Sequence, residues 1–328
     1  MDYIQQAYKV LHDWWRYLVG TILVFFAWQL IGMIPLMLTI GIKIVNGDKI
    51  PGDIPQMVSL LGNNLFLFLM LFSFAIGLAG LFFTTKFLHN QSITHLTTAR
   101  KKIDWKRFWF IFFLWGIVSS GFVLIDYFFL APENYILNFK WQPFLILCVI
   151  AIVLVPLQTS FEEYFFRGYL MQGFGVVLKN KWAPLLITSV GFGLLHIANP
   201  EVEKLGYIIM VYYIGTGLFL GIITLMDEGL ELALGFHAAN NLFTALLVTA
   251  DWTAFQTDSI LKDISDPEKM GLAEIFVPVF VIFPIFLFIL SKKYNWTNWK
   301  ERLLGNVVEP PKENYKILED IGKHDSKL

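Results

Sequence analysis

Residues 143–159 read PFLILCVIAIVLVPLQT and are followed at once by SFEEYFFRGYLM, residues 160–171. The first part carries no formal charge, as expected of a helix that crosses a bilayer, which needs about 20 predominantly apolar residues. The second part places Glu162, Glu163 and Arg167 close together in the same apolar surroundings. An ionisable group near the bilayer centre costs a few kcal/mol on insertion scales, so this cluster needs a structural or chemical reason.

Two of these three charges can satisfy each other. Glu163 and Arg167 stand four residues apart and therefore share one face of a helix, where they can form an ion pair. We interpret this pair as structural support. Glu162 is then left without a partner in its own segment, and an acid held in a low-dielectric site is a candidate general base.

The composition places this chain among polytopic α-helical membrane proteins. Of its 328 residues, 56% are hydrophobic and only 16% are charged, whereas soluble domains carry about 25% charged residues. The net charge of −1 gives no reason to expect a nucleic-acid partner. The single cysteine, Cys148, excludes an internal disulfide and a cysteine-rich metal site. The N-terminal residues have neither a basic region nor a small-residue cleavage site, so we expect no removable signal peptide.

Apolar stretches predict an all-α, polytopic membrane helix bundle with about eight transmembrane helices. They lie near residues 17–42, 57–85, 108–130, 143–178, 182–198, 205–226, 231–250 and 272–291. We therefore expect one membrane domain over residues 17–291. An amphipathic, interfacial segment at residues 1–16 precedes it, and a polar, partly disordered cytoplasmic tail at residues 292–328 follows it.

Lysine and arginine residues predict the orientation. Fourteen of them fall in segments that are cytoplasmic when the N-terminus is cytoplasmic, against six in the alternate segments. The positive-inside rule then places both termini in the cytoplasm, and we expect a bacterial plasma membrane. The basic stretch at residues 98–107 is expected to contact anionic membrane lipids. The aspartate-rich segment at residues 251–270 is expected to be a solvated outer loop.

Three polar groups interrupt the membrane part of the chain: Glu162 to Arg167, Phe192 to His196, and His237 to Asn241. Among the histidines, only His196 and His237 are flanked by apolar sequence. A single histidine in a membrane protein is more often a hydrogen-bonding group between helices than a catalyst. The combination of an acid without a partner, two histidines and an amide is what favours chemistry.

The spacing of these residues brings two of the groups to the same depth. The fourth and fifth apolar stretches are separated only by Lys179-Asn180-Lys181, which predicts a tight antiparallel hairpin. At 1.5 Å per residue, Glu162 and His196 each lie roughly 25 Å from that turn. His196 is also only a few residues before Pro200, so we expect a break in the helix near Asn199-Pro200 and a re-entrant loop at residues 197–204.

Such a set of residues supports hydrolysis of a peptide bond. A carboxylate assisted by imidazole can take a proton from water, and histidine and asparagine donors can stabilise the resulting oxyanion. Alternatively, Glu162, His196 and His237 could bind a divalent metal such as zinc, which acidifies its bound water. A serine nucleophile is not favoured, because Ser160 and Ser189 lie in no recognisable nucleophile elbow.

The three groups together resemble the CPBP family, which includes CAAX prenyl endopeptidases of the Rce1 type and bacteriocin-immunity proteins. The resemblance rests on Glu162-Glu163-x-x-x-Arg167, Phe192-x-x-x-His196 and His237-x-x-x-Asn241, and covers about residues 140–250. It implies an eight-helix bundle with a conical cavity that opens toward the cytosol. Glu162 would activate water with His196 as its partner, and His237 and Asn241 would stabilise the oxyanion. Family members are often called metalloproteases, but these residues do not decide whether a metal takes part.

Two classes of function follow. The first is an intramembrane endopeptidase that acts on a membrane-associated protein or peptide, possible CAAX-like substrates included. The second is a non-catalytic immunity or scaffold protein on the same fold. A transporter that uses Glu162 as a proton relay is a third, weaker alternative. The intact acid, histidine and asparagine positions favour the enzyme.

Overall fold

The computed structural model describes residues 1–269, 271–311 and 313, and it confirms an all-α, polytopic membrane protein. Among these residues, six helical segments are long and apolar enough to cross a membrane. They are Trp14–Val45, Asn63–Leu88, Trp105–Leu130, Trp141–Leu178, Tyr207–Asp227 and Leu272–Lys293. The expected number of eight is not confirmed, because two of the predicted spans are shorter helices, α9 (Trp182–Leu194) and α12 (Glu231–Leu247).

Four of the long segments contain a π-helical turn. The first consists of α1 (Trp14–Phe25), a π-helical turn (Phe26–Ile31) and α2 (Ile34–Val45). The third consists of α6 (Trp105–Ile125) and a π turn (Asp126–Leu130), and the last of α13 (Leu272–Val277), a π turn (Pro278–Ile282) and α14 (Phe283–Lys293). The fourth joins α7 (Trp141–Glu163), a π turn (Tyr164–Leu170) and α8 (Met171–Leu178). The remaining long helices are α4 (Asn63–Leu88) and α11 (Met210–Asp227).

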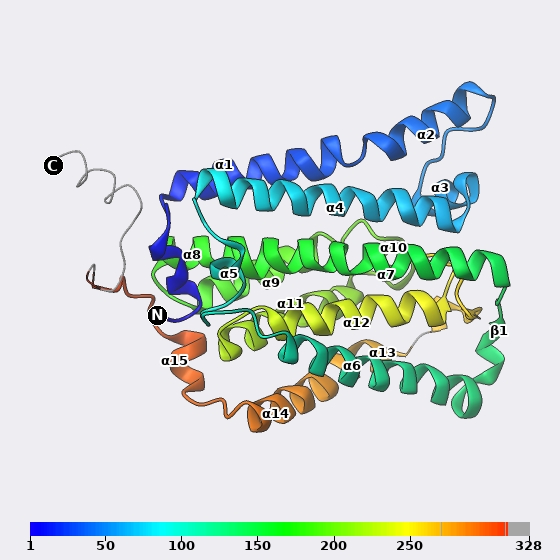
Figure 1. Ribbon diagram of the computed structural model, residues 1–328. Coiled ribbons are helices and arrows are strands. Elements are labelled where there is room, and N and C mark those ends of the chain that lie inside the picture. Colours follow the sequence, from blue (N-terminus) through cyan, green and yellow to red (C-terminus); the bar gives the residue numbers. More distant parts are fainter. Residues whose placement is uncertain (270, 312, 314–328) are drawn as a thin grey trace.

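The helices run lengthwise through an elongated bundle (Figure 1). α1, α2 and α4 form one outer layer, and α4 packs on α7. α12 lies at the centre, where it packs against both α6 and α7, while α11 packs against α9. The shorter helices α3 (Ile54–Leu61), α5 (Ile93–Thr97), α10 (Pro200–Leu205) and α15 (Trp299–Leu304) connect or flank these elements. Single 3-10 turns occur at Pro132–Asn134, Tyr207–Ile209 and Pro267–Lys269.

A small sheet closes the end of the bundle that lies farthest from the N-terminus (Figure 1). β1 (Tyr135–Leu137) pairs antiparallel with β3 (Leu261–Asp263), and β3 pairs in parallel with β2 (Val248–Thr249). The segment between β2 and β3 is not wholly solvated as expected, because Thr257 and Ser259 are buried. The Thr257 hydroxyl donates to the carbonyl of Ala245 in α12, which fastens this segment to the bundle.

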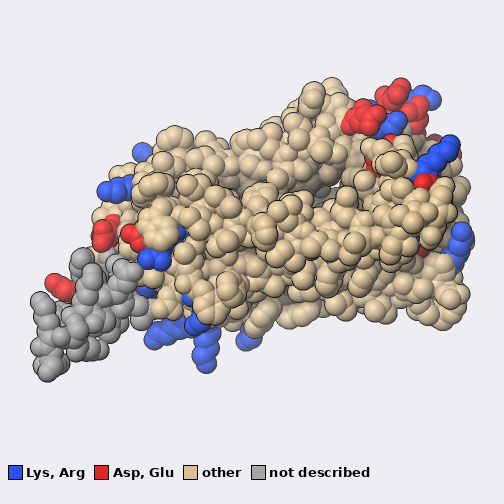
Figure 2. All heavy atoms as spheres, turned by 90° about the horizontal axis from the view of Figure 1, so that it is seen from above, with Lys and Arg blue, Asp and Glu red and all other residues tan. Residues whose placement is uncertain are grey.

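The outer surface has the distribution of charge that a bilayer requires. Figure 2 shows charged side chains gathered at the two ends of the molecule and an uncharged belt between them. Large apolar side chains such as Phe129, Ile117 and Val149 are more than two-thirds exposed. Exposed apolar side chains are stable in contact with lipid chains, so the protein is an integral membrane protein.

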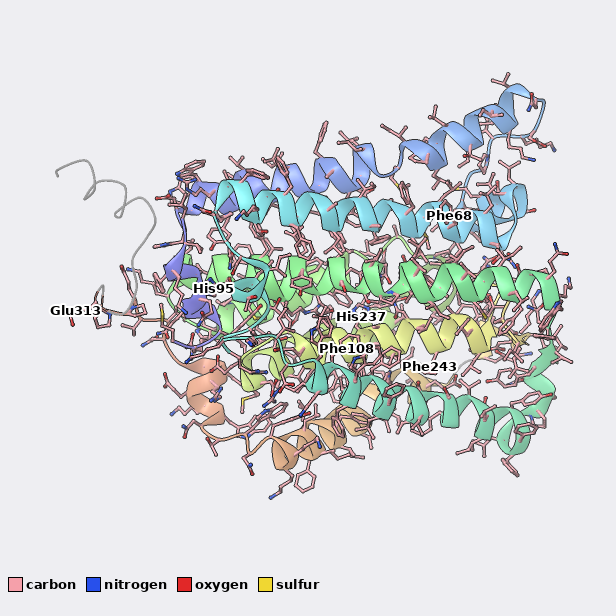
Figure 3. The ribbon with its side chains drawn as sticks, in the orientation of Figure 1. Phe68, His95, Phe108, His237, Phe243 and Glu313 are labelled. Carbon is pink, nitrogen blue, oxygen red and sulfur yellow. The ribbon has the colours of Figure 1, made fainter. Side chains whose placement is uncertain are left out.

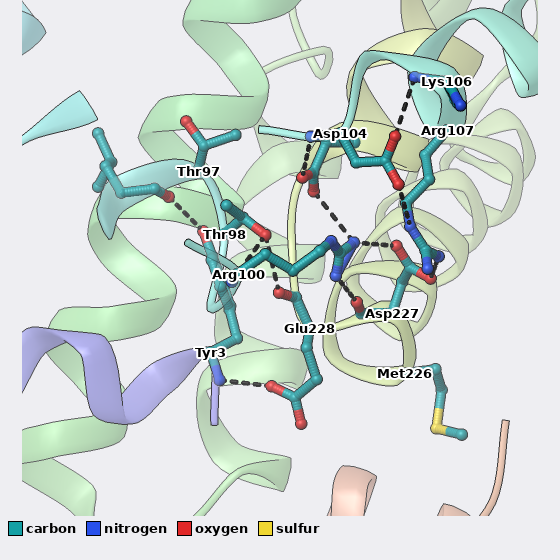
Figure 4. A network of polar contacts seen from close by, with 12 residues as sticks. Tyr3, Thr97, Thr98, Arg100, Asp104, Lys106, Arg107, Met226, Asp227 and Glu228 are labelled. Carbon is teal, nitrogen blue, oxygen red and sulfur yellow. Dashed lines mark hydrogen bonds and ion pairs between the residues drawn. The ribbon is translucent and has the colours of Figure 1, made fainter. Parts of the chain in front are cut away.

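The end that carries the N-terminus is closed by a polar network (Figure 4). Arg100 and Arg107 both bind the buried carboxylate of Asp227, where α11 ends, and Arg100 also contacts Glu231 at 3.4 Å. The basic stretch expected to contact lipids is therefore partly committed to internal ion pairs. The backbone N–H of Tyr3 donates to Glu228 in the same network.

The N-terminal segment is more deeply packed than a helix that lies flat on a membrane. A 3-10 helix (Ile4–Lys9) packs against α8, and Tyr3 is fully buried. The Tyr3 hydroxyl donates to the carbonyls of Leu96 and Arg167. Trp14 and Trp15, at the start of α1, are exposed, as an interfacial position requires.

Candidate active site

The charged cluster lies where α7 changes into a π-helical turn. Glu162 and Glu163 are the last residues of α7, and Arg167 lies within the π turn Tyr164–Leu170. The side chains of Glu163 and Arg167 are fully buried, and Glu162 is only 6% exposed. Single π turns inside α-helices often occur at functional sites because they rotate the side chains that follow. Here the turn sets the charged side chains at the centre of the bundle.

Arg167 is held by three different contacts. Its Nη1 donates to Glu163 Oε1 at 3.0 Å, and its Nη2 donates to the carbonyl of Gly217 in α11 at 3.1 Å. The guanidinium also lies over the ring of Phe192 in α9, 4.3 Å from its centroid. Arg167 thus contacts α7, α9 and α11.

His237 approaches both glutamates from α12. Its Nδ1 lies 2.8 Å from Glu163 Oε1, and its Nε2 lies 3.5 Å from Glu162 Oε2. Because a carboxylate only accepts, Nδ1 carries a proton and donates it to Glu163. Nε2 is therefore the nitrogen that faces Glu162. Figure 3 shows His237 in the interior of the bundle, between the ribbons of α7 and α12.

His196 lies two residues beyond the end of α9, in the turn that leads to α10. Its Nδ1 donates to the carbonyl of Phe192 at 2.9 Å, which leaves Nε2 available. Its ring stacks on Tyr213 of α11, with centroids 4.4 Å apart and an interplanar angle of 20°. The helix break predicted near Asn199-Pro200 is present, because α9 ends at Leu194 and α10 begins at Pro200.

Asn241 is held at the end of a chain of hydrogen bonds. The indole N–H of Trp115 donates to Asn240, whose amide donates to Asn241 Oδ1, and Asn241 Nδ2 donates to Gln158 Oε1 at 3.1 Å. These contacts fix the orientation of the Asn241 amide. Since the amide nitrogen carries two protons, one of them is free for a further acceptor.

One cavity of about 270 Å³ brings most of these residues together. Glu162, His196 and Asn241 line it, and His237 lies behind Glu162. Its apolar wall comes from Trp28, Met70 and Phe74 of the layer formed by α1, α2 and α4. Glu162 and His196, which the sequence placed at similar distances from the turn at residues 179–181, thus line the same cavity.

Several residues that line the cavity come from α10 and from the segment next to the sheet. Asn199 and Glu201 line it from the α10 region, and Ala254 and Phe255 line it from the segment between β2 and β3. The resemblance implies a cavity that opens toward the cytosol, and the charges predict cytoplasmic termini, whereas the N-terminus lies at the opposite end of the bundle from the sheet (Figure 1). The end of the bundle that carries the N-terminus is closed by the ion pairs of Asp227 with Arg100 and Arg107.

Four polar residues that line the cavity were not predicted from the sequence: Gln158, Glu201, Tyr213 and Thr244. Glu201 Oε1 accepts a hydrogen bond from the backbone N–H of Ala254 at 2.9 Å. Burial raises the pKa of the Glu201 carboxyl, and the Ala254 hydrogen bond opposes that rise. The Asn199-Pro200 break signalled that this segment turns inward, but nothing in the sequence indicated which side chain the turn would present.

Among the described residues, no group of three or more His, Cys, Asp and Glu side chains is placed to hold a metal ion, and a metal at Glu162, His196 and His237 stays a prediction. His237 Nδ1 is hydrogen-bonded to Glu163, and His196 Nδ1 to a backbone carbonyl, so each histidine could bind a metal only through Nε2. The site instead presents one acid, one imidazole nitrogen that faces it, and amide and imidazole donors, which together suit proton transfer to and from water.

Comparison with known proteins agrees with the motifs. Residues 140–243 match a family model described as type II CAAX prenyl endopeptidase Rce1-like. The chain is also similar to a protein of Bacillus subtilis (strain 168) described as uncharacterized protein YyaK. The two are 32% identical over 239 residues, which span 72% of this chain and 78% of that relative. No solved structure matches the chain. The matched region contains Glu162, Glu163, Arg167, His196, His237 and Asn241.

Proposed function

We propose that this chain, which belongs to the Rce1-like family of type II CAAX prenyl endopeptidases, is an intramembrane endopeptidase that hydrolyses a peptide bond of a membrane-associated protein or peptide. One observation carries the proposal. Glu162 lines a cavity together with His196 and Asn241, and its buried Oε2 accepts no hydrogen bond from any described residue. An acid so placed is ready to accept a proton from a bound water.

In the proposed reaction, Glu162 takes a proton from water as the water oxygen attacks the carbonyl carbon of the substrate. The negative charge that develops on the carbonyl oxygen is met by the free N–H of Asn241 and by His196 Nε2 in its protonated form. Glu162 then gives the proton to the leaving nitrogen as the C–N bond breaks, which yields a carboxylic acid and an amine.

The contacts favour a different role for His237 from the one that the resemblance implies. Because His237 donates to Glu163 and turns its Nε2 toward Glu162, it acts on the base rather than on the oxyanion. We propose that His237 is a positioning residue for Glu162. His196, whose Nε2 is available, takes the place of His237 beside Asn241.

No step of the proposed reaction passes through a metal ion, because no group of three or more His, Cys, Asp and Glu side chains among the described residues is placed to hold one. We therefore expect hydrolysis by the purified protein to survive prolonged treatment with EDTA or 1,10-phenanthroline. Peptide hydrolysis before and after chelation, with metal content measured on the same samples, checks this. Loss of activity that zinc restores would show that the residues rearrange around a metal.

The test of the function is Glu162→Gln. Removal of the base while the shape of the side chain is kept should lower hydrolysis by at least 100-fold, in line with the loss of general base catalysis. Membrane proteomes of a deletion strain complemented with the unaltered protein, with Glu162→Gln or with Glu203→Gln are compared for uncleaved termini. Glu203 is an exposed acid on α10 that does not line the cavity, so it serves as the matched control.

The immunity or scaffold alternative makes the opposite prediction. If Glu162→Gln restored the full phenotype and left the membrane proteome unchanged, the catalytic reading would fail. Size-exclusion profiles of both variants in detergent identify any loss that comes from misfolding.

A further inference from the structure

The cavity has more acidic than basic side chains. Two carboxyl groups, Glu162 and Glu201, line it together with one imidazole, His196, and none of its lining residues is a lysine or an arginine. The nearby Arg167 does not compensate, because its guanidinium is bound to Glu163 and to the carbonyl of Gly217. The two carboxyl groups attract a cationic side chain of a substrate that enters this cavity, and they repel an anionic one.

Of the two carboxyl groups, Glu201 is the one that the proposed chemistry does not use. It approaches the cavity from α10, whereas Glu162 approaches from α7 and is contacted by His237. Glu201 Oε1 is fixed by the Ala254 amide, so its orientation does not depend on the substrate. Its Oε2 is buried and accepts no hydrogen bond from any described residue.

A buried carboxylate oxygen that accepts no hydrogen bond destabilises the free protein. A ligand that donates a hydrogen bond to this oxygen removes the destabilisation. The lining neighbours of Glu201, Asn199 and Tyr213, are uncharged and do not neutralise it. An ammonium or guanidinium group supplies both the opposite charge and the missing hydrogen bond.

We propose that Glu201 is a specificity-determining residue that receives a lysine or arginine side chain of the substrate near the scissile bond. The inference rests on the proposed peptidase function and names a substrate class for it. It also implies that a free C-terminal carboxylate bound in this cavity is disfavoured, so the preferred bond lies within a basic segment rather than next to an acidic or free carboxyl end.

The experiment uses the full-length protein in detergent and a library of short synthetic peptides with amidated C-termini, in which each position is varied. Cleavage sites are read by mass spectrometry for the unaltered protein, Glu201→Gln, Glu201→Lys and the control Glu203→Gln. Glu201→Gln keeps an oxygen that can accept from Ala254, so the local fold is retained. The same peptides with free carboxyl ends form a second arm.

The unaltered protein and Glu203→Gln should prefer lysine or arginine over norleucine at one fixed position by about 10-fold, the typical value of a hydrogen bond to a charged group. Glu201→Gln should abolish that preference while hydrolysis of the norleucine peptide continues. Glu201→Lys should shift the preference toward glutamate.

Identical preferences in the unaltered protein and Glu201→Gln would overturn the inference and leave the peptidase function standing. Absence of cleavage by the unaltered protein, at the level of Glu162→Gln, would overturn the peptidase function and the inference with it.

Discussion

Neighbouring residues in the chain, Glu162 and Glu163, have different surroundings in the structure. Glu163 accepts from both Arg167 and His237 and is fully buried, so it joins its own helical segment to α12. Glu162 borders the cavity. Removing one partner of a buried ion pair typically costs about 3–5 kcal/mol, so a change at Glu163 or Arg167 tests the fold before it tests the chemistry. Glu162 is the position at which activity and stability can be separated.

His89 gives a pH-dependent test of packing at the end of α4. It is fully buried, its Nδ1 donates to the Leu11 carbonyl at 2.7 Å, and its Nε2 lies 2.9 Å from the Tyr169 hydroxyl. Burial lowers the pKa of His89 to about 4. In the unfolded chain the pKa returns to about 6.5, so the unfolded state binds the extra proton between these two pH values.

Stability should therefore fall as the pH is lowered from 6.5 to 4, by about 3 kcal/mol from this residue alone. Thermal unfolding in detergent across that range measures the effect. His89→Gln removes the titration, so its free energy of unfolding should depend less on pH over the same window. Parallel pH profiles for the two proteins would contradict the assignment.

At the scale of elements, the crossing of α9 and α11 positions His196 and the Arg167 anchor. Gly217 makes this crossing possible, because a Cβ added there would lie 2.7 Å from the backbone oxygen of Ser189. Backbone atoms cannot move aside as side chains can. Small residues at such contacts are the usual means by which membrane helices approach closely.

Gly217→Ala should therefore destabilise the protein by about 1–3 kcal/mol, as overpacking does in a close-packed core. Gly41→Ala in α2 is the matched control, because no atom lies within 4 Å of an added Cβ there. The control should be neutral or slightly stabilising, since alanine favours helix more than glycine does. Detergent thermal melts of both variants compare them, and equal melting temperatures would show that the crossing can relax.

The α7 segment shows why helix type matters for the site. Pro156 lies inside α7, and the π turn at Tyr164–Leu170 follows the two glutamates directly. The apolar sequence predicted one long helix over this region, which is what the structure has. The π turn depends on contacts with α9, α11 and the N-terminal segment, and the apolar pattern gives no sign of it.

At the scale of the whole molecule, the distribution of basic residues predicts which side of the membrane each end of the bundle faces. The N-terminus and α15 lie at one end of the bundle, and the sheet lies at the other (Figure 1). Ala254 and Phe255, from the segment between β2 and β3, line the cavity. If the basic residues face the cytoplasm, as the positive-inside rule predicts, the end of the bundle that carries the sheet lies on the opposite side of the membrane. A substrate would then reach Glu162 from outside the cytoplasm or from within the bilayer.

Single cysteines introduced into a Cys148→Ala background test this orientation. Glu268→Cys, near the sheet, should react with a membrane-impermeant maleimide on intact cells, because Glu268 is exposed at the cavity end. Lys300→Cys, in α15, should react only after the membrane is permeabilised. The reverse pattern would show that the termini lie outside, and would make the cytosolic opening and the structure compatible.

The sequence by itself determined the class of the protein and the chemical character of its site. Continuous apolar stretches require helices in a bilayer, because only a helix satisfies its own backbone hydrogen bonds there. The charged cluster at residues 162–167, and the histidines and asparagine at 196, 237 and 241, stood out because ionisable groups are costly in that medium. The short hairpin at 179–181 was enough to place Glu162 and His196 at one depth.

Tertiary structure alone decided which of these groups touch. Local spacing fixes pairs within a helix, such as Glu163 and Arg167, but not the rotation and docking of α12, which bring His237 to both glutamates. It also decided that Glu201 and Ala254 enclose the cavity, because they come from segments 53 residues apart. Contacts of that kind depend on how whole helices pack, and no local pattern in the sequence encodes them.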